Sequence, residues 1–252
     1  MSSELSISGS CDGSCKTEPF DLEITMAFQP IVDLRKQEIF AYEALVRGAD
    51  GRSAAEVLAL VDTNNMFSFD QRCRVLAIAQ AAELKMDTRL SINFIPNAVY
   101  EPRSCIKATL AASEEFCFPK ERLIFEVVEG ERVTSRQHLA SIFLAYASFG
   151  FMTALDDFGE GFSGLNHLVR LRPDLLKMDM MLVRDIDTDP RKRAVVGAVV
   201  RLGRELGVGV VAEGVETEEE VATLLEIGVT LFQGYVIARP EVGALPKPRL
   251  SF

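Results

Sequence analysis

The chain alternates short apolar runs with amphipathic segments from about Ile24 almost to its end, and this alternation constrains its fold more than any other feature. Most of the eight strand-like runs are apolar at consecutive positions, which is typical of strands that are covered on both faces. We expect strands at Met26–Val32, Phe40–Val46, Leu90–Ile95, Leu123–Val128, Phe151–Leu155, Leu175–Met178, Gly209–Ala212 and Leu231–Val236.

Three of the intervening segments carry clear helix signals. Thr217–Ile227 begins with a capping box, in which Glu220 follows Thr217 by three residues, and it ends before a glycine. Ser135–Ser148 and Arg193–Leu206 also stop shortly before a glycine. Eight strands alternating with helices predict an α/β protein of the (β/α)₈ TIM-like barrel type. Periodicity alone also allows a doubly wound open sheet.

Polar residues recur where the apolar runs end. They span 190 residues in six intervals, or about 32 residues per interval, which is the size of one βα unit. A barrel gathers the carboxyl ends of its strands around one mouth, whereas an open sheet spreads them along a crevice, so the recurrence favours a barrel with a single site. Taken alone, each acid is better explained as a helix cap or a solvated strand end than as part of a site. The residues are Glu43, Asn93, Glu126, Asp156 with Asp157, Lys177, Glu213 and Gln233.

This set of side chains predicts a centre for hard divalent cations. Carboxylate and amide oxygens suit Mg²⁺ or Mn²⁺, whereas zinc usually recruits histidine or cysteine, and the only histidines, His138 and His167, fall in helix-like segments. Adjacent carboxylates such as Asp156 and Asp157 repel each other unless a cation or a proton lies between them. The number of acids suggests two cations. Arg47 and Lys177 supply positive side chains for a phosphate and its attacking water, or simply pair with the acids.

The acidic balance of the chain argues against several partners. A net charge of −10 over 252 residues disfavours general affinity for nucleic acid or for an anionic membrane surface. No apolar run approaches the roughly 20 residues of a membrane span. Because no signal peptide opens the chain and its five cysteines are scattered, we expect a cytoplasmic protein. Residues 1–20 are predicted to be a flexible leader, in which Cys11 and Cys15 hold no metal, and residues 21–252 to be the functional domain.

Eight short motifs occur in order between residues 24 and 241. They are QPIV (29–32), YEALVRG (42–48), SIN (91–93), EVVE (126–129), DDFG (156–159), LKMD (176–179), AEGVE (212–216) and QGY (233–235). No single motif of three residues is specific, but the ordered set is. It resembles the EAL-domain family of bacterial cyclic di-GMP phosphodiesterases.

The resemblance implies a barrel whose first strand is antiparallel, and it implies a role for each matching position. One metal ion would be held by Glu43, Asn93, Glu126 and Asp156, and the second by Asp156, Asp157 and Glu213. Catalytic residues would be Lys177, Glu213 and Asp157. Substrate contacts would come from Gln29, Leu45, Arg47 and Gln233. Supporting acids would be Glu129, Asp179 and Glu216.

The reaction that the resemblance implies is hydrolysis of cyclic di-GMP to linear pGpG with two Mg²⁺ or Mn²⁺ ions, and Ca²⁺ is expected to inhibit it. The alternatives are a phosphodiesterase for another dinucleotide, and a non-catalytic cyclic di-GMP receptor or antirepressor-like protein of the same fold. The family also implies a homodimer near the loop that follows Asp157. Glu160 and Phe162 depart from the family pattern in that loop, so the resemblance leaves its coupling and the turnover rate open, whereas Val128 replaces a common threonine as a packing change.

Overall fold

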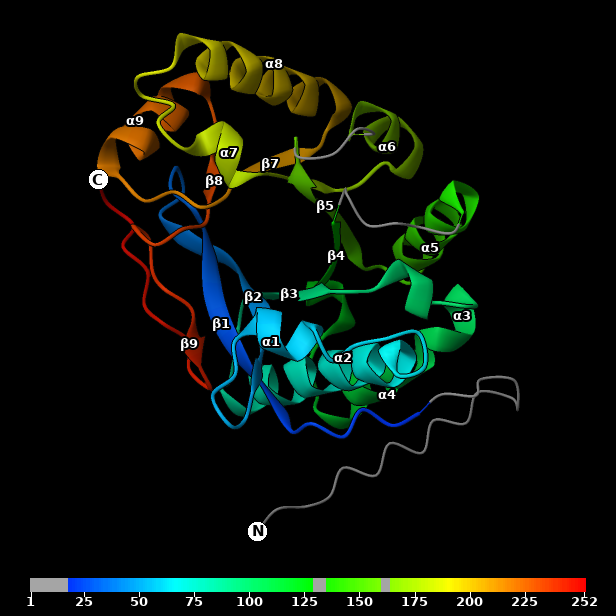
Figure 1. Cartoon of the computed structure of the whole chain (residues 1–252). Coiled ribbons are helices and arrows are strands. Elements are labelled where there is room, and N and C mark those ends of the chain that lie inside the picture. Colours follow the sequence, from blue (N-terminus) through cyan, green and yellow to red (C-terminus); the bar gives the residue numbers. More distant parts are fainter. Residues whose placement is uncertain (1–17, 129–134, 160–163) are drawn as a thin grey trace.

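The computed structural model describes residues 18–128, 135–159 and 164–252, and these residues form a closed barrel of eight strands with helices around it (Figure 1). The strand order β2-β3-β4-β5-β6-β7-β8-β1 closes through the pairing of β1 with β2. The strands are β1 Ile24–Asp33, β2 Glu38–Gly48, β3 Arg89–Asn93, β4 Leu123–Val128, β5 Met152–Phe158, β6 Leu175–Met178, β7 Gly209–Ala212 and β8 Leu231–Phe232. The predicted (β/α)₈ barrel is therefore confirmed, and the open sheet is wrong.

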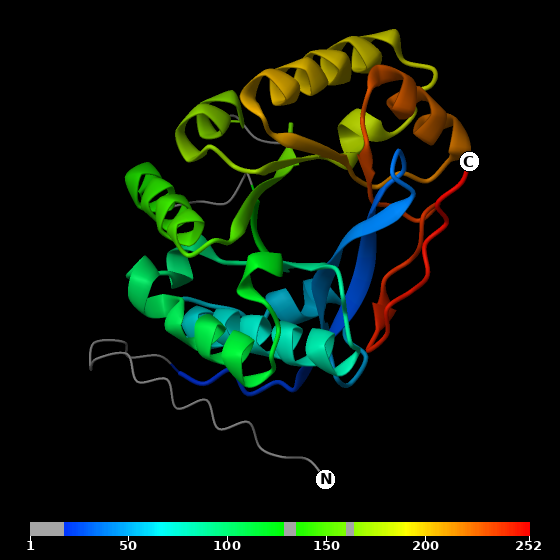
Figure 2. The ribbon, with the colours of Figure 1, turned by 180° about the vertical axis from the view of Figure 1, so that it is seen from behind.

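Helices cover the outer face of the barrel, and the ring they form is also seen from behind (Figure 2). The longest are α2 and α8, which cover opposite sides of the ring. The helices are α1 Ala54–Leu58, α2 Met66–Glu83, η1 Pro96–Ala98, α3 Pro102–Cys105, α4 Lys107–Glu115, η2 Lys120–Arg122, α5 Arg136–Ser148, α6 Gly164–Leu171, α7 Met180–Val183, α8 Pro190–Leu206 and α9 Glu218–Ile227.

The first strand runs against its neighbours, as the resemblance implied. β1 pairs antiparallel with β2 and with β8, whereas every pair from β2–β3 to β7–β8 is parallel. A short ninth strand, β9 Glu241–Val242, joins β1 outside the barrel. Just before β1, the Phe20 ring is buried against Phe69 of α2, and Arg72 donates to the Phe20 carbonyl. The chain is thus fixed to the barrel from at least Phe20 onward.

The other predicted helix ends are confirmed, but α8 begins at Pro190, three residues before the predicted start at Arg193, and two predicted strands are too long. Thr217 and Glu220 form the expected capping box, and Gly228 ends α9 in the left-handed conformation. Leu231–Val236 is a strand only as far as Phe232, because Gly234 then turns against the backbone of Val215. Leu90–Ile95 ends as a strand at Asn93, three residues before η1 begins at Pro96.

The barrel interior is filled by a layer of apolar side chains from seven of the eight strands. Strands present alternate side chains to opposite faces, so one residue in each of these seven strands reaches this layer and its neighbours point outward to the helices. The layer fills one end of the barrel. The other end is lined by the residues that follow these apolar residues along the parallel strands. The members of the apolar layer are Ile31, Ala41, Ile124, Ala154, Leu175, Val211 and Leu231.

Within the described ranges, no helix is both long and apolar enough to cross a bilayer.

Candidate active site

A layer of polar side chains lies next to the apolar layer inside the barrel, two residues further along the parallel strands. The side chain two residues on points to the same face of a strand, so each parallel strand that contributes an apolar residue contributes a polar one above it. Ala41 is followed by Glu43, Ile124 by Glu126 and Ala154 by Asp156. The same step gives Lys177 after Leu175, Glu213 after Val211 and Gln233 after Leu231, while antiparallel β1 reverses it and places Gln29 before Ile31.

A backbone irregularity brings two adjacent carboxylates to the same site. Consecutive residues of a regular strand point to opposite faces, which would separate Asp156 from Asp157. The register of β5 against β6 shifts between Leu155 and Phe158, and Asp157 adopts a positive φ of 53°. Such a bulge redirects a side chain at the end of a strand. As a result, both carboxylates can join one group of acids.

Lys177 lies at the centre of this layer, and its side chain is only 1% exposed. Its ammonium nitrogen lies 2.7 Å from Glu126, 2.8 Å from Glu213, and 3.3 Å from both Glu43 and Asp156. One cation thus contacts four carboxylates that come from four different strands or strand ends. In the sequence these acids are up to 170 residues apart, from Glu43 to Glu213.

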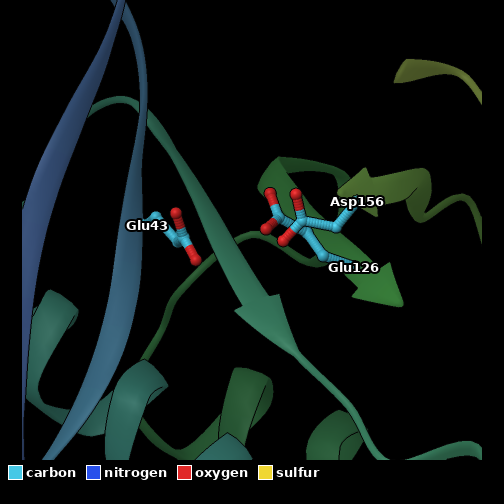
Figure 3. A group of neighbouring side chains, drawn as sticks. All are labelled: Glu43, Glu126 and Asp156. Carbon is cyan, nitrogen blue, oxygen red and sulfur yellow. The ribbon is translucent and has the colours of Figure 1, made fainter. Parts of the chain in front are cut away.

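The acids form two groups that could each hold a cation. Glu43, Glu126 and Asp156 make one group, and Asp156, Asp157 and Glu213 make the other. In each group the candidate ligand atoms lie within 4.8 Å of one another. Figure 3 shows the first group, in which Glu43 on β2 faces Glu126 and Asp156 across the barrel mouth. Asp156 belongs to both groups, as in the ligand partition that the resemblance implies.

The shared environment alters the ionisation of these acids. Burial raises the pKa of Glu126 to about 8, and the negative charges of Glu43 and Asp156 add to the rise while Lys177 opposes it. Burial also raises the pKa of Glu213 well above its ordinary value. Burial acts on Asp156 in the same direction, but Lys177 and a hydrogen bond from Glu213 outweigh it and lower the pKa of Asp156. Without bound cations, Glu126 and Glu213 therefore hold their protons at a higher pH than ordinary glutamates do.

Amide and hydroxyl groups complete the hydrogen bonding of the layer. The Asn93 side-chain nitrogen donates to Glu43 at 2.8 Å, and that of Gln233 donates to the other Glu43 oxygen at 2.7 Å. Gln29 lies beside Gln233, at 3.4 Å. Ser91, to which the sequence analysis gave no role, donates to Glu126. Its position two residues before Asn93, on the same face of β3, was the signal available in the sequence.

A polar pocket of about 290 Å³ opens beside the second group of acids, lined by Asp157, Glu213 and Gln233 among others. Asp179 lines it and also caps α7, accepting from the Met181 amide at 2.8 Å. Glu216 lies at the exposed rim, paired with Arg184 at 2.5 Å. Both residues therefore border the site without joining either group of acids.

Other predicted site residues are less directly connected to the acids. Arg47 donates to the Val46 carbonyl at 2.7 Å. Leu45 lines a separate apolar pocket of about 420 Å³, between β2 and helices α1 and α2, which Asn93 also borders. Glu129, Glu160 and Phe162 lie outside the described residues.

Curated relatives include both an antirepressor and a phosphodiesterase. The chain is 27% identical over 234 residues to the blue light- and temperature-regulated antirepressor BluF of Escherichia coli, covering 92% of this chain and 58% of BluF. It is 32% identical over 159 residues to the cyclic di-GMP phosphodiesterase RocR of Pseudomonas aeruginosa, covering 63% of this chain and 40% of RocR. The chain thus spans about half the length of these relatives.

Solved structures share the fold over nearly the whole chain. A standalone EAL protein from Vibrio cholerae, in its c-di-GMP-bound form, is 46% identical with a TM-score of 0.88, covering 91% of this chain and 97% of that one. BlrP1 from Klebsiella pneumoniae, in complex with calcium and cyclic di-GMP, is 33% identical with a TM-score of 0.85, covering 91% of this chain and 58% of BlrP1. The EAL domain profile matches residues 21–240, and the chain belongs to the EAL-domain family.

Proposed function

We propose that this protein hydrolyses cyclic di-GMP to the linear dinucleotide pGpG with two divalent cations, Mg²⁺ or Mn²⁺. The observation that carries the proposal is the pair of acid groups that share Asp156, each with its ligand atoms within 4.8 Å. Two neighbouring cation sites form the clamp that many phosphodiester-cleaving enzymes use on the attacking and leaving oxygens.

The charge and chemistry of the layer fit two hard cations. Five carboxylates converge there against one ammonium group, that of Lys177, which leaves an excess of four negative charges when all the acids are ionised. Two divalent cations would neutralise this excess and would make an acidic mouth attractive to a phosphate. The donor atoms are oxygens, which Mg²⁺ and Mn²⁺ prefer.

The bound cations would supply positive charge to a phosphate and lower the pKa of a water toward neutrality. The chain's own groups would place the reactants around them. Lys177, between the two acid groups, would orient the attacking water, and Arg47 would hold a phosphate oxygen. Gln29, Leu45 and Gln233 would contact the substrate.

The comparisons support this substrate. The Vibrio protein is described in complex with c-di-GMP, BlrP1 with cyclic di-GMP and calcium or manganese, and RocR is named a cyclic di-GMP phosphodiesterase. In this chain the side-chain oxygen of Gln233 is buried and, within the described residues, accepts no hydrogen bond. It is therefore available to a donor on a bound ligand in the polar pocket.

Product analysis tests the proposal. Purified protein with Mg²⁺ or Mn²⁺ should convert cyclic di-GMP to pGpG, and Glu43→Ala should abolish this conversion while the protein remains folded. Rates on other cyclic and linear dinucleotides would establish the substrate preference. Retention of cyclic di-GMP without any linear product would overturn hydrolysis in favour of a receptor.

The relationship to BluF makes a protein-binding antirepressor the second candidate. A protein that only binds a partner has no need of five mutually repelling carboxylates in one place, whereas a two-metal hydrolase does. The same product assay separates the two functions.

We also propose that two copies of the chain associate near the loop after Asp157. The neighbouring helix α6 exposes Leu165 at 62% and Val169 at 71%, and α5, which packs beside it, exposes Leu144 at 70%. Exposed apolar side chains on adjacent helices are typical of interaction surfaces. Light scattering should report a dimer that Leu165→Glu with Val169→Glu dissociates, whereas Leu58→Glu on α1 should leave it intact.

A further inference from the structure

A buried ion pair lies on the outer side of the barrel, behind the strands that carry Asn93 and Glu126. Asp70 and Arg74 stand one turn apart on α2, and Arg74 Nη2 lies 2.8 Å from Asp70 Oδ2. Their side chains are 1% and 0% exposed. Arg74 also donates through Nη1 to the Tyr146 hydroxyl of α5, at 2.7 Å. Arg74 therefore links α2 to α5 in the buried layer between the helices and the barrel.

Three aromatic rings enclose the Arg74 cation, and two of them adjoin predicted metal ligands in the sequence. Its Cζ atom lies 5.6 Å from the ring centre of Phe94, 5.2 Å from that of Phe125 and 5.7 Å from that of Tyr146. Phe94 directly follows Asn93, and Phe125 directly precedes Glu126. Because adjacent strand residues point to opposite faces, the rings face Arg74 while their neighbours face the site.

Asp70 makes a second contact, with the backbone that leaves β3. Its Oδ1 accepts from the Ile95 amide at 2.9 Å. The preceding amide, that of Phe94, donates to the Glu126 carbonyl at 3.0 Å. The two amides after Asn93 are thus fixed, one by β4 and one by α2. Asn93 itself contacts Glu43 at 2.8 Å, so a shift of this turn would move a ligand of the first acid group.

A buried ion pair is poor evidence for a stabilising role, because apolar residues of similar volume often stabilise a fold equally well. Apolar residues cannot accept a hydrogen bond from Ile95, and a buried amide without a partner is unfavourable. We propose that Asp70 is a positioning residue for the first metal site, holding the end of β3 so that Asn93 faces Glu43, and that Arg74 neutralises Asp70 so that it can be buried. This inference rests on the proposed two-metal function.

Two double variants separate this role from simple stability. Asp70→Leu with Arg74→Met removes both charges and the acceptor for Ile95, whereas Asp70→Asn with Arg74→Met removes both charges but keeps a side-chain oxygen for that amide. Isothermal titration of Mn²⁺ without substrate should show affinity reduced by about 10- to 100-fold in the first variant, as expected when a group supporting a ligand is lost. The second variant should bind Mn²⁺ nearly as the parent does.

Hydrogen exchange gives a measurement that needs no variant. In the parent protein without metal, the Ile95 amide should exchange slowly, at a rate typical of buried hydrogen-bonded amides. Fast exchange of this amide, or equal Mn²⁺ affinity in both double variants, would overturn the positioning role. Failure of the parent protein itself to bind Mn²⁺ would instead count against the proposed function, which keeps the two outcomes distinct.

Discussion

Lys177 Nζ lies 2.7 Å from Glu126 Oε2 inside the barrel mouth, and neither side chain is more than 1% exposed. Lys177 also contacts Glu43, Asp156 and Glu213, so its charge offsets part of the negative charge of both acid groups. Its pKa is raised well above the ordinary value, because Asp156, Glu126 and the other acids outweigh the effect of burial. Lys177 therefore carries its positive charge at neutral pH.

Replacing this lysine should damage both stability and activity. Lys177→Met leaves the buried acids without their cation, and breaking such a buried pair costs about 3–5 kcal/mol of unfolding free energy. Loss of the group that would orient the attacking water should lower kcat by about 10²-fold or more. Denaturant unfolding without metal and turnover with Mn²⁺ measure the two effects.

Lys36→Met is the matched control, because Lys36 is 65% exposed and its ammonium nitrogen lies no closer than 3.5 Å to the acids it pairs with, Asp33 and Glu38. It should change the unfolding free energy by less than about 1 kcal/mol. A Lys177→Met protein as stable and as active as this control would contradict the central role of Lys177.

The raised pKa of Glu126, about 8, predicts opposite effects of pH on stability and on metal affinity. Between its ordinary value of 4.5 and about 8, Glu126 is protonated in the folded protein but not in the unfolded chain. The unfolding free energy of the metal-free protein should therefore fall as pH rises through this window.

Cation binding must displace the same proton, so Mn²⁺ affinity should rise with pH through this window, by up to about tenfold per unit for each proton released. Titration calorimetry in buffers of different ionisation enthalpy counts the protons. An affinity that is independent of pH would show that Glu126 is already ionised.

The position of the site was predictable from the sequence because strand periodicity fixes it. A strand that buries an apolar residue inside the barrel presents the residue two further on to the same face, so Glu43, Glu126, Asp156 and Lys177 had to meet if the barrel closed. The roles assigned to individual residues came from the family resemblance, since spacing alone does not distinguish a ligand from a cap.

Other features could not be predicted, because they depend on contacts between residues that are far apart in the sequence. The left-handed conformation of Asp157 follows from a register shift between β5 and β6, and β8 ends early because Gly234 meets Val215. Asp70 and Arg74 left a weak signal, as opposite charges four residues apart on α2, with a further charge, Arg72, between them. Only the packing of β3, β4 and α5 around them shows that they form a buried pair.

Calcium should bind the site without supporting hydrolysis. Its ligand shell is larger and looser than that of Mg²⁺, with oxygen distances of about 2.3–2.6 Å against about 2.0–2.1 Å, so it would hold a phosphate less rigidly for attack. Ca²⁺ should therefore raise the melting temperature and retain cyclic di-GMP, yet yield no pGpG and inhibit the Mn²⁺-dependent reaction. Turnover with Ca²⁺ at the rate seen with Mn²⁺ would contradict this view.

Gly234, which follows Gln233, should tolerate no side chain. A Cβ atom at this position would lie 2.1 Å from the Val215 carbonyl oxygen and 2.3 Å from the Val215 nitrogen, and backbone atoms cannot move aside as a flexible side chain can. The same two loops are joined by hydrogen bonds from the Val215 amide to the Gln233 carbonyl and from the Val236 amide to the Val215 carbonyl, both at 3.2 Å. Gly234→Ala must therefore push the turns after β7 and β8 apart, and these turns carry Glu213 and Gln233.

We expect Gly234→Ala to lower the unfolding free energy by about 1–3 kcal/mol, the usual cost of overpacking, and to reduce Mn²⁺ affinity along with turnover. Gly197→Ala in α8 is the control, because the nearest atom to its Cβ would be the end of the Arg201 side chain at 3.6 Å. Alanine is favoured over glycine inside a helix by about 0.5–1 kcal/mol, so this variant should be slightly more stable and fully active. Equal melting temperatures and equal Mn²⁺ affinities for the two variants would show that the contact between Gly234 and Val215 does not hold Glu213 and Gln233 in place.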